Sequence, residues 1–235
     1  MQLHLMSFNT QHCLNYLERR IDFEIMARAV LACGADIVGL QEMRSESEHP
    51  DYAAQVEELS RLTGMPYCYF AEAIRFPNEG PYGNALLSKI PILRAESIPI
   101  PEPDPHGYRG YYEQRCVLRA ELEGGITVLV THFGLNQDEK ENAVSTVLSL
   151  LPERRCILMG DFNLHPDDPL LLPIRERMTD TASFFPSPLA SYPSDAPESK
   201  IDYIFVTPDL AVEAADIPAI VASDHRPHTA TVAVE

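Results

Sequence analysis

Acids, amides and histidines stand at the ends of several short apolar stretches of this 235-residue chain. The residues concerned are Asn9, Glu42, His132, Asp161, Asn163, Asp202, Asp224 and His225. Each of them alone has an ordinary explanation, because Asp and Asn favour turns and strand ends, where they make local hydrogen bonds. Several such ends that carry only groups suited to metal binding and proton transfer indicate a functional site instead.

The oxygen-bearing members of this set predict a site for a hard divalent cation. Glu42 and Asp224 supply carboxylates and Asn9 supplies an amide oxygen. The chain has no cysteine–histidine pattern with zinc-ligand spacing, so Mg²⁺ or Mn²⁺ is favoured over Zn²⁺. Asp161, with the amide of Asn163 two residues on, can orient an attacking water, and the histidines can hold charge on a phosphoryl group. Phosphate-ester hydrolysis requires in-line positioning and cancellation of developing negative charge.

The overall charge argues against nucleic acid as the favoured substrate. The chain has 35 acidic and 18 basic residues, a net charge of −17, and no basic run. Affinity for polyanions comes mainly from Lys and Arg contacts to phosphates, and a nucleic-acid binder usually concentrates these residues on one face. A local positive groove, or the metal itself, can still serve a phosphate substrate on an acidic protein.

The cysteines and the apolar segments predict the compartment. The five cysteines are odd in number and include no C-x-x-C pair, which favours reduced thiols. Residues 1–7 lack the charged region and apolar run of a signal peptide. No stretch approaches the roughly 18 apolar residues of a membrane span. We therefore expect a monomeric, cytoplasmic protein.

The elements that must position these residues alternate between strands and helices. We predict strands over residues 3–8, 36–40, 85–87, 92–98, 117–122, 126–131, 156–159, 201–206 and 229–234. We predict helices over residues 21–33, 51–63 and 139–151. Proline-rich loops at 98–106 and 185–197 are either rims of the site or rigid connectors. This order favours two packed β-sheets with helices outside, in a single domain over residues 1–235.

Sequence blocks around the candidate residues are similar to those of a known family. The blocks are Ser7-Phe8-Asn9, Asp36-Ile37-Val38-Gly39-Leu40-Gln41-Glu42, Tyr82-Gly83-Asn84-Ala85-Leu86-Leu87-Ser88, Thr131-His132-Phe133, Gly160-Asp161-Phe162-Asn163, Lys200-Ile201-Asp202-Tyr203-Ile204-Phe205 and Ser223-Asp224-His225-Arg226-Pro227. In this order they resemble the endonuclease/exonuclease/phosphatase superfamily, which includes deoxyribonucleases, abasic-site endonucleases, neutral sphingomyelinases and inositol polyphosphate phosphatases. The resemblance implies an α+β fold, a four-layer α/β/β/α sandwich of two mainly antiparallel sheets.

The resemblance also implies roles for the metal-side and water-side residues. Glu42 corresponds to the principal metal ligand, with Asn9 beside it and Asp224 at the metal side. Asp161 corresponds to the residue that activates or orients the nucleophilic water. Asn163 corresponds to the residue that holds this geometry and contacts phosphate.

The histidines receive roles in the same way. His225 corresponds to the residue that meets the scissile phosphate as an acid/base or charge stabiliser, and Asp202 to the carboxylate that orients it. His132 corresponds to the second phosphate-facing histidine.

Three further residues are candidates for substrate binding. His12 is close to Asn9 in sequence and can reach a substrate, but a solvated loop histidine fits equally well. Asn84 is a candidate for the floor of the pocket. Glu113-Gln114-Arg115 offers a substrate-binding arginine, a carboxylate for His132, or a surface pair.

These observations predict a Mg²⁺- or Mn²⁺-dependent hydrolase of a small-molecule or lipid-derived phosphate ester. The alternative within the family is a DNA endonuclease or exonuclease of the abasic-site repair or deoxyribonuclease type. Repair-type members present aromatic and basic elements to DNA, and this chain has no Trp. A catalytically dead binding module is disfavoured because no catalytic position is missing.

Overall fold

Two six-stranded sheets pack face to face in the computed structural model, which describes residues 1–45, 47, 52 and 54–234. The first sheet has the order β11-β12-β1-β2-β4-β3. Its strands are β1 (Gln2–Asn9), β2 (Ile37–Arg44), β3 (Tyr67–Phe76), β4 (Gly80–Ser88), β11 (Leu210–Asp216) and β12 (His228–Val234). The second sheet has the order β5-β6-β7-β8-β10-β9. Its strands are β5 (Ile92–Pro99), β6 (Cys116–Leu122), β7 (Ile126–His132), β8 (Cys156–Asp161), β9 (Thr179–Asp180) and β10 (Asp202–Val206).

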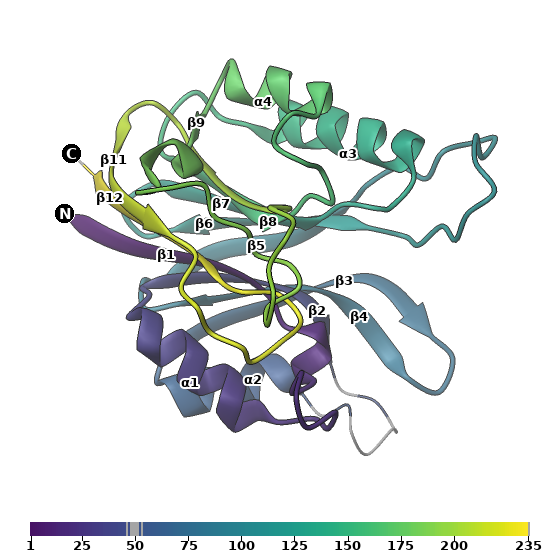
Figure 1. Cartoon of the computed structure of the whole chain (residues 1–235), viewed down its shortest axis with the longest axis horizontal. Coiled ribbons are helices and arrows are strands. Elements are labelled where there is room, and N and C mark those ends of the chain that lie inside the picture. Colours follow the sequence, from purple (N-terminus) through teal and green to yellow (C-terminus); the bar gives the residue numbers. More distant parts are fainter. Residues whose placement is uncertain (46, 48–51, 53, 235) are drawn as a thin grey trace.

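Helices cover the outer face of each sheet. The helices α1 (Phe23–Cys33) and α2 (Gln55–Thr63) lie on the first sheet, and α3 (Gln137–Leu150) and α4 (Leu172–Arg175) lie on the second (Figure 1). Among the described strands, one pair of neighbours in each sheet is parallel, β1 with β2 and β7 with β8, and the other pairs are antiparallel. The predicted α/β/β/α sandwich of mainly antiparallel sheets is therefore confirmed.

Three apolar layers hold the four structural layers together. The central layer lies between the sheets and includes Leu5, Val130 and Ile204. A second layer joins the first sheet to α1 and α2, and a third joins the second sheet to α3 and α4. Burial of this apolar surface is the main stabilising contribution, and it fixes the strand ends relative to one another.

The strands that the sequence pattern did not predict lie at sheet edges. β3 and β11 are the two edges of the first sheet. Most residues of β3 are only partly buried, so it lacks the alternation of a half-buried strand. A register shift between Val212 and Ala214 interrupts the alternation of β11.

Capping residues set the helix boundaries. Asp22 accepts a hydrogen bond from the Ile25 N–H, so α1 begins at Phe23, two residues later than the sequence pattern predicts. Gly34 ends it in the left-handed region, with φ 63°. The predicted helix over residues 51–63 begins at Gln55, and residues 51 and 53 lie outside the described part of the chain.

A buried histidine ties the first sheet to the second. His228 begins β12, and its Nδ1 lies 3.2 Å from the main-chain oxygen of Asp202 on β10. The Thr181 hydroxyl lies 3.0 Å from its Nε2. Burial and the nearby Lys200 ammonium lower the pKa of His228 to about 3. Burial therefore favours a neutral ring, whose Nδ1–H donates to the main-chain oxygen of Asp202. The Thr181 hydroxyl donates to the main-chain oxygen of Ile204 at 2.9 Å.

This histidine is expected to make stability fall as the pH is lowered. Below about pH 6.5 the unfolded state binds a proton that the folded state does not bind. The free energy of unfolding should therefore fall by up to about 1.4 kcal/mol per pH unit from this group. Urea denaturation between about pH 6.5 and 5 measures the slope, and His228→Asn should reduce it. His106→Gln, on an exposed loop, is the control, and equal slopes for wild type and His228→Asn would contradict the assignment.

Candidate active site

Strand pairing places three of the predicted residues in one row at the end of the second sheet. In the register, His132 on β7 pairs with Asp161 on β8, and Asp161 pairs with Asp202 on β10. Directly paired residues project to the same face of a sheet, so the three side chains meet there. Gly160 permits the close approach of β8 to β7, because a Cβ at this position would collide with the main-chain oxygen of Thr131.

Asp161 is the centre of the site. Its Oδ2 lies 3.6 Å from His132 Nε2 and 3.7 Å from His225 Nε2, and it accepts a 3.1 Å hydrogen bond from Asn9 Nδ2. Asn9 ends β1 of the first sheet, so this last contact crosses between the sheets. Asp161 is almost completely buried. The site therefore lies where strand ends of both sheets converge.

Two polar residues of the site have left-handed backbone conformations. Glu42 has φ 61° at a register shift in β2, and Asn163 has φ 51°. In Asn163 this bend allows its N–H to donate to Asp161 Oδ1 at 3.0 Å. Residues other than glycine seldom adopt this conformation, and such strain is concentrated at functional sites.

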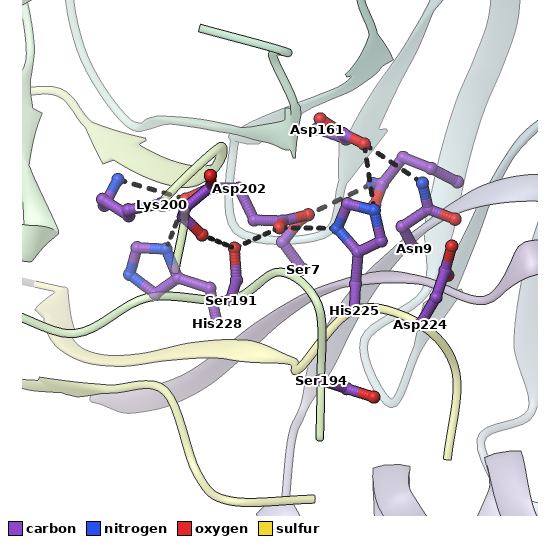
Figure 2. A network of polar contacts seen from close by, with 12 residues as sticks. Ser7, Asn9, Asp161, Ser191, Ser194, Lys200, Asp202, Asp224, His225 and His228 are labelled. Carbon is purple, nitrogen blue, oxygen red and sulfur yellow. Dashed lines mark hydrogen bonds and ion pairs between the residues drawn. The ribbon is translucent and has the colours of Figure 1, made fainter. Parts of the chain in front are cut away.

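His225 is paired with Asp202. Its Nδ1 lies 2.8 Å from Asp202 Oδ2, which also accepts a hydrogen bond from the Ser191 hydroxyl (Figure 2). The Lys200 ammonium binds the main-chain oxygen of Asp202 at 3.1 Å, from the side away from His225 (Figure 2). Asp202 is thus held by side chains on either side of it, and it fixes the orientation of the imidazole.

The charges of this network are set by burial and by neighbouring groups. Burial raises the pKa of Asp161 to about 7, although the positive charge of His225 opposes this shift. Burial alone would lower the pKa of His225, but the carboxylates of Asp202 and Asp161 raise it to about 10. The structure thus favours an imidazolium at His225 beside a carboxyl group whose pKa is raised by burial.

Glu42 and Asp224 form the candidate metal site. Burial raises the pKa of Glu42, and the negative charge of Asp224 raises it further, while a 3.0 Å hydrogen bond from Asn9 Nδ2 to Oε1 opposes the shift. The Oδ1 of Asn9 accepts from the Gln11 N–H at 3.1 Å, which fixes the orientation of the amide. Asn9 therefore presents its nitrogen to Glu42 and Asp161, and its oxygen has one lone pair left for a cation.

A second group of metal-ligand types occurs within the network. Asp161, Asp202 and His225 have ligand atoms within 4.8 Å of one another. Each nitrogen of His225 faces one of these carboxylates. Hydrogen bonding and ion pairing between the imidazole and the two carboxylates therefore account for the short distances within this group. Glu42 and Asp224 fit a cation better, because the two carboxylates are close enough for the charge of Asp224 to raise the pKa of Glu42, and carboxylate oxygens are the ligands that hard cations prefer.

His132 has an arginine, not a carboxylate, at its outer nitrogen. Arg115 Nη1 lies 3.0 Å from His132 Nδ1 and 2.9 Å from Glu113 Oε1. Glu113 thus pairs with Arg115 and is not the carboxylate partner of His132, one of the three alternatives that the sequence left open. Burial lowers the pKa of His132 well below its usual value, and the charge of Arg115 lowers it further.

The other two candidates for substrate binding lie outside this network. Asn84 is buried and donates to the main-chain oxygen of Cys116 at 3.0 Å, so it links β4 to β6. His12 lies in a turn with φ 48°, and its ring packs edge-on against Tyr52 with 5.9 Å between the centroids. Burial and the charge of Arg44 lower the pKa of His12.

The loop over residues 185–197 contributes residues to which sequence reasoning assigned no role. Ser191 donates to Asp202, the Ser194 N–H donates to the main-chain oxygen of Asp224 at 2.7 Å, and the Ser194 hydroxyl donates to that of Ser223. A serine in a proline-rich loop carries no spacing signal, so only the three-dimensional structure could identify these residues. The loop thus makes hydrogen bonds to Asp202, Ser223 and Asp224. These contacts favour the interpretation of the loop as a functional rim of the site over that of a rigid connector.

The fold and the site together define a class of protein: a two-sheet sandwich with outer helices and a buried acid–histidine centre where the strand ends meet. Residues 6–225 match the model of the Endonuclease/Exonuclease/phosphatase family, and the chain belongs to this family. The resemblance noted in the sequence is thereby confirmed. Members of this family are phosphoester hydrolases. No curated protein sequence matches the chain.

Solved structures of low sequence identity share the fold. An endonuclease/exonuclease/phosphatase from Beutenbergia cavernae is 21% identical, with TM-score 0.78 over 99% of this chain and 72% of that chain. One from Bacteroides vulgatus is 20% identical, with TM-score 0.76 over 100% of both chains. A mannosyl-6-phosphatase from Bacteroides thetaiotaomicron is 16% identical, with TM-score 0.73 over 98% of this chain and 99% of that chain. Within the described residues no helix combines the length and apolar character of a membrane span.

Proposed function

We propose that the protein hydrolyses a small-molecule or lipid-derived phosphate ester with the aid of Mg²⁺ or Mn²⁺. The observation that carries the proposal is the environment of Asp161. This buried carboxyl group has the Nε2 atoms of two histidines at 3.6 and 3.7 Å and the amide of Asn9 at 3.1 Å. A base surrounded by hydrogen-bond donors suits the attack of water on phosphorus, where negative charge develops on the phosphoryl oxygens.

Asp161 is the general base in this proposal. A base works best when its pKa lies near the operating pH, and burial raises the pKa of Asp161 to about 7. The carboxylate accepts a proton from water as the water oxygen forms a bond to phosphorus. Asn163 holds Asp161 through the 3.0 Å hydrogen bond from its N–H to Oδ1.

His225 is the group that handles charge at the scissile phosphate. Its Nδ1 donates to Asp202, so its Nε2–H points into the site. As the bond from phosphorus to the leaving oxygen breaks, the imidazolium stabilises the negative charge or gives its proton to that oxygen. His132 supplies a second Nε2 atom, 3.6 Å from the same oxygen of Asp161.

Glu42, Asp224 and the free lone pair of Asn9 are the residues that would hold the cation. Their oxygens match the ligands that Mg²⁺ and Mn²⁺ prefer. The bound cation would polarise a phosphoryl oxygen and offset negative charge. The two carboxylates fit such a group, because burial and the negative charge of Asp224 raise the pKa of Glu42, and a bound cation would offset that charge.

The acidic surface and the family relatives support a small substrate. The net charge of −17 disfavours long polyanions. A structural relative is by its title a mannosyl-6-phosphatase, so a sugar phosphate is one candidate. A lipid-derived ester remains in the same proposal, because both present one phosphate to the metal site.

A substrate panel tests this proposal. The purified protein is incubated with Mg²⁺ or Mn²⁺ and para-nitrophenyl phosphate, bis(para-nitrophenyl) phosphate, sugar phosphates, phospholipid vesicles and plasmid with and without abasic sites. We expect metal-dependent hydrolysis of a small or lipid-derived ester. Efficient nicking of plasmid at low enzyme concentration, with small esters untouched, would favour the nuclease alternative and overturn the substrate assignment.

Glu42→Gln should weaken cation binding. Loss of one carboxylate from the site removes a charged ligand, and we expect the affinity for Mn²⁺ to fall by at least about 10-fold in calorimetric titration. Glu72→Gln, on the partly exposed strand β3, is the matched control and should bind as the wild type does. Equal Mn²⁺ affinity in Glu42→Gln and wild type would remove Glu42 from the metal site.

A further inference from the structure

Arg115 is a largely buried arginine that contacts a histidine of the candidate site. It lies directly before β6, and its side chain is 13% exposed. One nitrogen, Nη1, reaches both His132 Nδ1 at 3.0 Å and Glu113 Oε1 at 2.9 Å. Glu113, also 13% exposed at its side chain, balances the charge of the guanidinium. These three residues form a chain that ends at His132 Nε2, 3.6 Å from Asp161.

The chemistry of the guanidinium decides which nitrogen of His132 carries the proton. An arginine has only N–H donors and remains charged in proteins, so Nδ1 of His132 must accept its hydrogen bond. The ring proton then lies on Nε2. A doubly protonated ring would place two N–H groups against each other, so the ring is also neutral. Burial and the charge of Arg115, which together lower the pKa of His132, act in the same direction.

The contact between His132 and Asn163 must be weighed against this assignment. Asn163 Nδ2 lies 3.3 Å from His132 Nε2 and 3.0 Å from the main-chain oxygen of Phe133. The shorter contact, to a carbonyl, fixes the amide nitrogen as the donor to Phe133. The bond from Arg115 is also shorter and is charge-assisted, so it determines the tautomer, and the 3.3 Å contact is packing.

We propose that Arg115, held by Glu113, is a positioning residue that keeps His132 as the neutral Nε2–H tautomer, a fixed hydrogen-bond donor to the reaction centre. Two histidines then face Asp161 with the same atom but different charge. His225 is cationic because a carboxylate holds its Nδ1, and His132 is neutral because an arginine holds its Nδ1. Arg115 therefore acts through His132, whereas a substrate-binding arginine would contact the phosphate itself.

A neutral His132 limits what this residue can do during hydrolysis, and this kinetic part of the inference rests on the proposed function. His132 cannot give up a proton and regain it as a general acid does, but it can donate a hydrogen bond to a phosphoryl oxygen throughout the reaction. Proton transfer at the leaving group is left to His225. A neutral donor also avoids a second positive charge beside Asp161, which would lower the basicity of that carboxylate.

The ring nitrogens of His132 report the tautomer directly. ¹⁵N NMR of uniformly labelled protein near pH 7, with His132→Gln used only to assign the signals, should show a protonated Nε2 and an unprotonated Nδ1 for His132. The same spectrum should show both nitrogens of His225 protonated. An imidazolium or a protonated Nδ1 at His132 would overturn the inference. This readout does not depend on activity, so it stands or fails separately from the proposed hydrolase function.

Replacement of Arg115 provides the second measurement. Arg115→Met should release His132, so that its ¹⁵N signals move towards a mixture of tautomers, and kcat should fall by about 10²-fold as the fixed donor is lost. KM should change little, because in this proposal Arg115 acts through His132 and not on the substrate. Arg115→Lys keeps a donor and should retain the Nε2–H tautomer and recover part of kcat. Arg119→Met changes a partly exposed arginine within β6 and is the matched control.

These variants also distinguish a positioning role of Arg115 from a substrate-binding role. A large rise in KM with unchanged kcat and unchanged His132 signals in Arg115→Met would identify Arg115 as a substrate-binding residue and refute the positioning role. Unchanged signals and unchanged kinetics would refute it equally. Circular dichroism and thermal unfolding check that each variant is folded. If Arg115→Met does not fold, the ¹⁵N spectrum of Arg115→Lys still tests the inference, because it should retain the Nε2–H tautomer of His132.

Discussion

Asp161→Asn is expected to lower kcat for phosphate-ester hydrolysis by at least about 10³-fold, because it removes the general base while keeping the size of the side chain. The carboxylate is the group on which Asn9, His132 and His225 converge. An amide in its place cannot accept a proton from water. The effect should appear in kcat more than in KM, since the loss is of transition-state stabilisation.

The comparison needs a control that leaves the centre intact. Asp167→Asn changes an exposed acid six residues further along the chain, and it should keep wild-type activity. Asp161→Asn should remain folded by circular dichroism, because removal of a buried carboxyl group with a raised pKa relieves a desolvation cost. A loss of less than about tenfold in kcat would contradict the role of Asp161 as base.

Asp202→Asn is expected to be the second most damaging conservative change, with a loss of about 10³- to 10⁴-fold in kcat. Asp202 Oδ2 accepts from His225 Nδ1 at 2.8 Å and, with Asp161, keeps the ring charged. An amide at this position removes the negative charge and allows the wrong tautomer of the imidazole. His225 would then lose both its orientation and the proton that handles the leaving oxygen.

Steady-state kinetics, with thermal unfolding to verify the fold, checks this second expectation. Asp195→Asn lies on the same loop as Ser191 but is exposed, and it serves as the control. Wild-type kcat in Asp202→Asn would show that His225 needs no carboxylate partner, and the proposed division of roles between the two histidines would be wrong.

Much of the fold was predictable because its central elements carry strong local signals. The strand β8 is a run of buried apolar residues that ends at Asp161, and α1 is bounded by Asp22 and Gly34. The edge strands β3 and β11 were not predicted, because partial exposure and a register shift remove the alternation on which such predictions depend. Their positions are decided by pairing with distant strands rather than by local preference.

The candidate site was predictable as a set of residues but not as a network. Strand ends are marked in the sequence by acids and histidines, and parallel or paired strands bring such ends together. The partner of His132 could not be predicted, because Arg115 lies just before β6, where the strand pattern does not determine the direction of its side chain. The orientation of the Asn9 amide and the contact from Ser191 to Asp202 likewise depend on segments far apart in the chain.

The most direct test of the central claim is the fate of the attacking oxygen. Hydrolysis of bis(para-nitrophenyl) phosphate, or of the best ester from the panel, is run with Mn²⁺ in water enriched in heavy oxygen, and both products are analysed by mass spectrometry. Attack of an Asp161-bound water on phosphorus predicts one heavy oxygen in the phosphate product and none in the released alcohol. Label in the alcohol, or the absence of metal-dependent hydrolysis of every ester in the panel, would contradict the account.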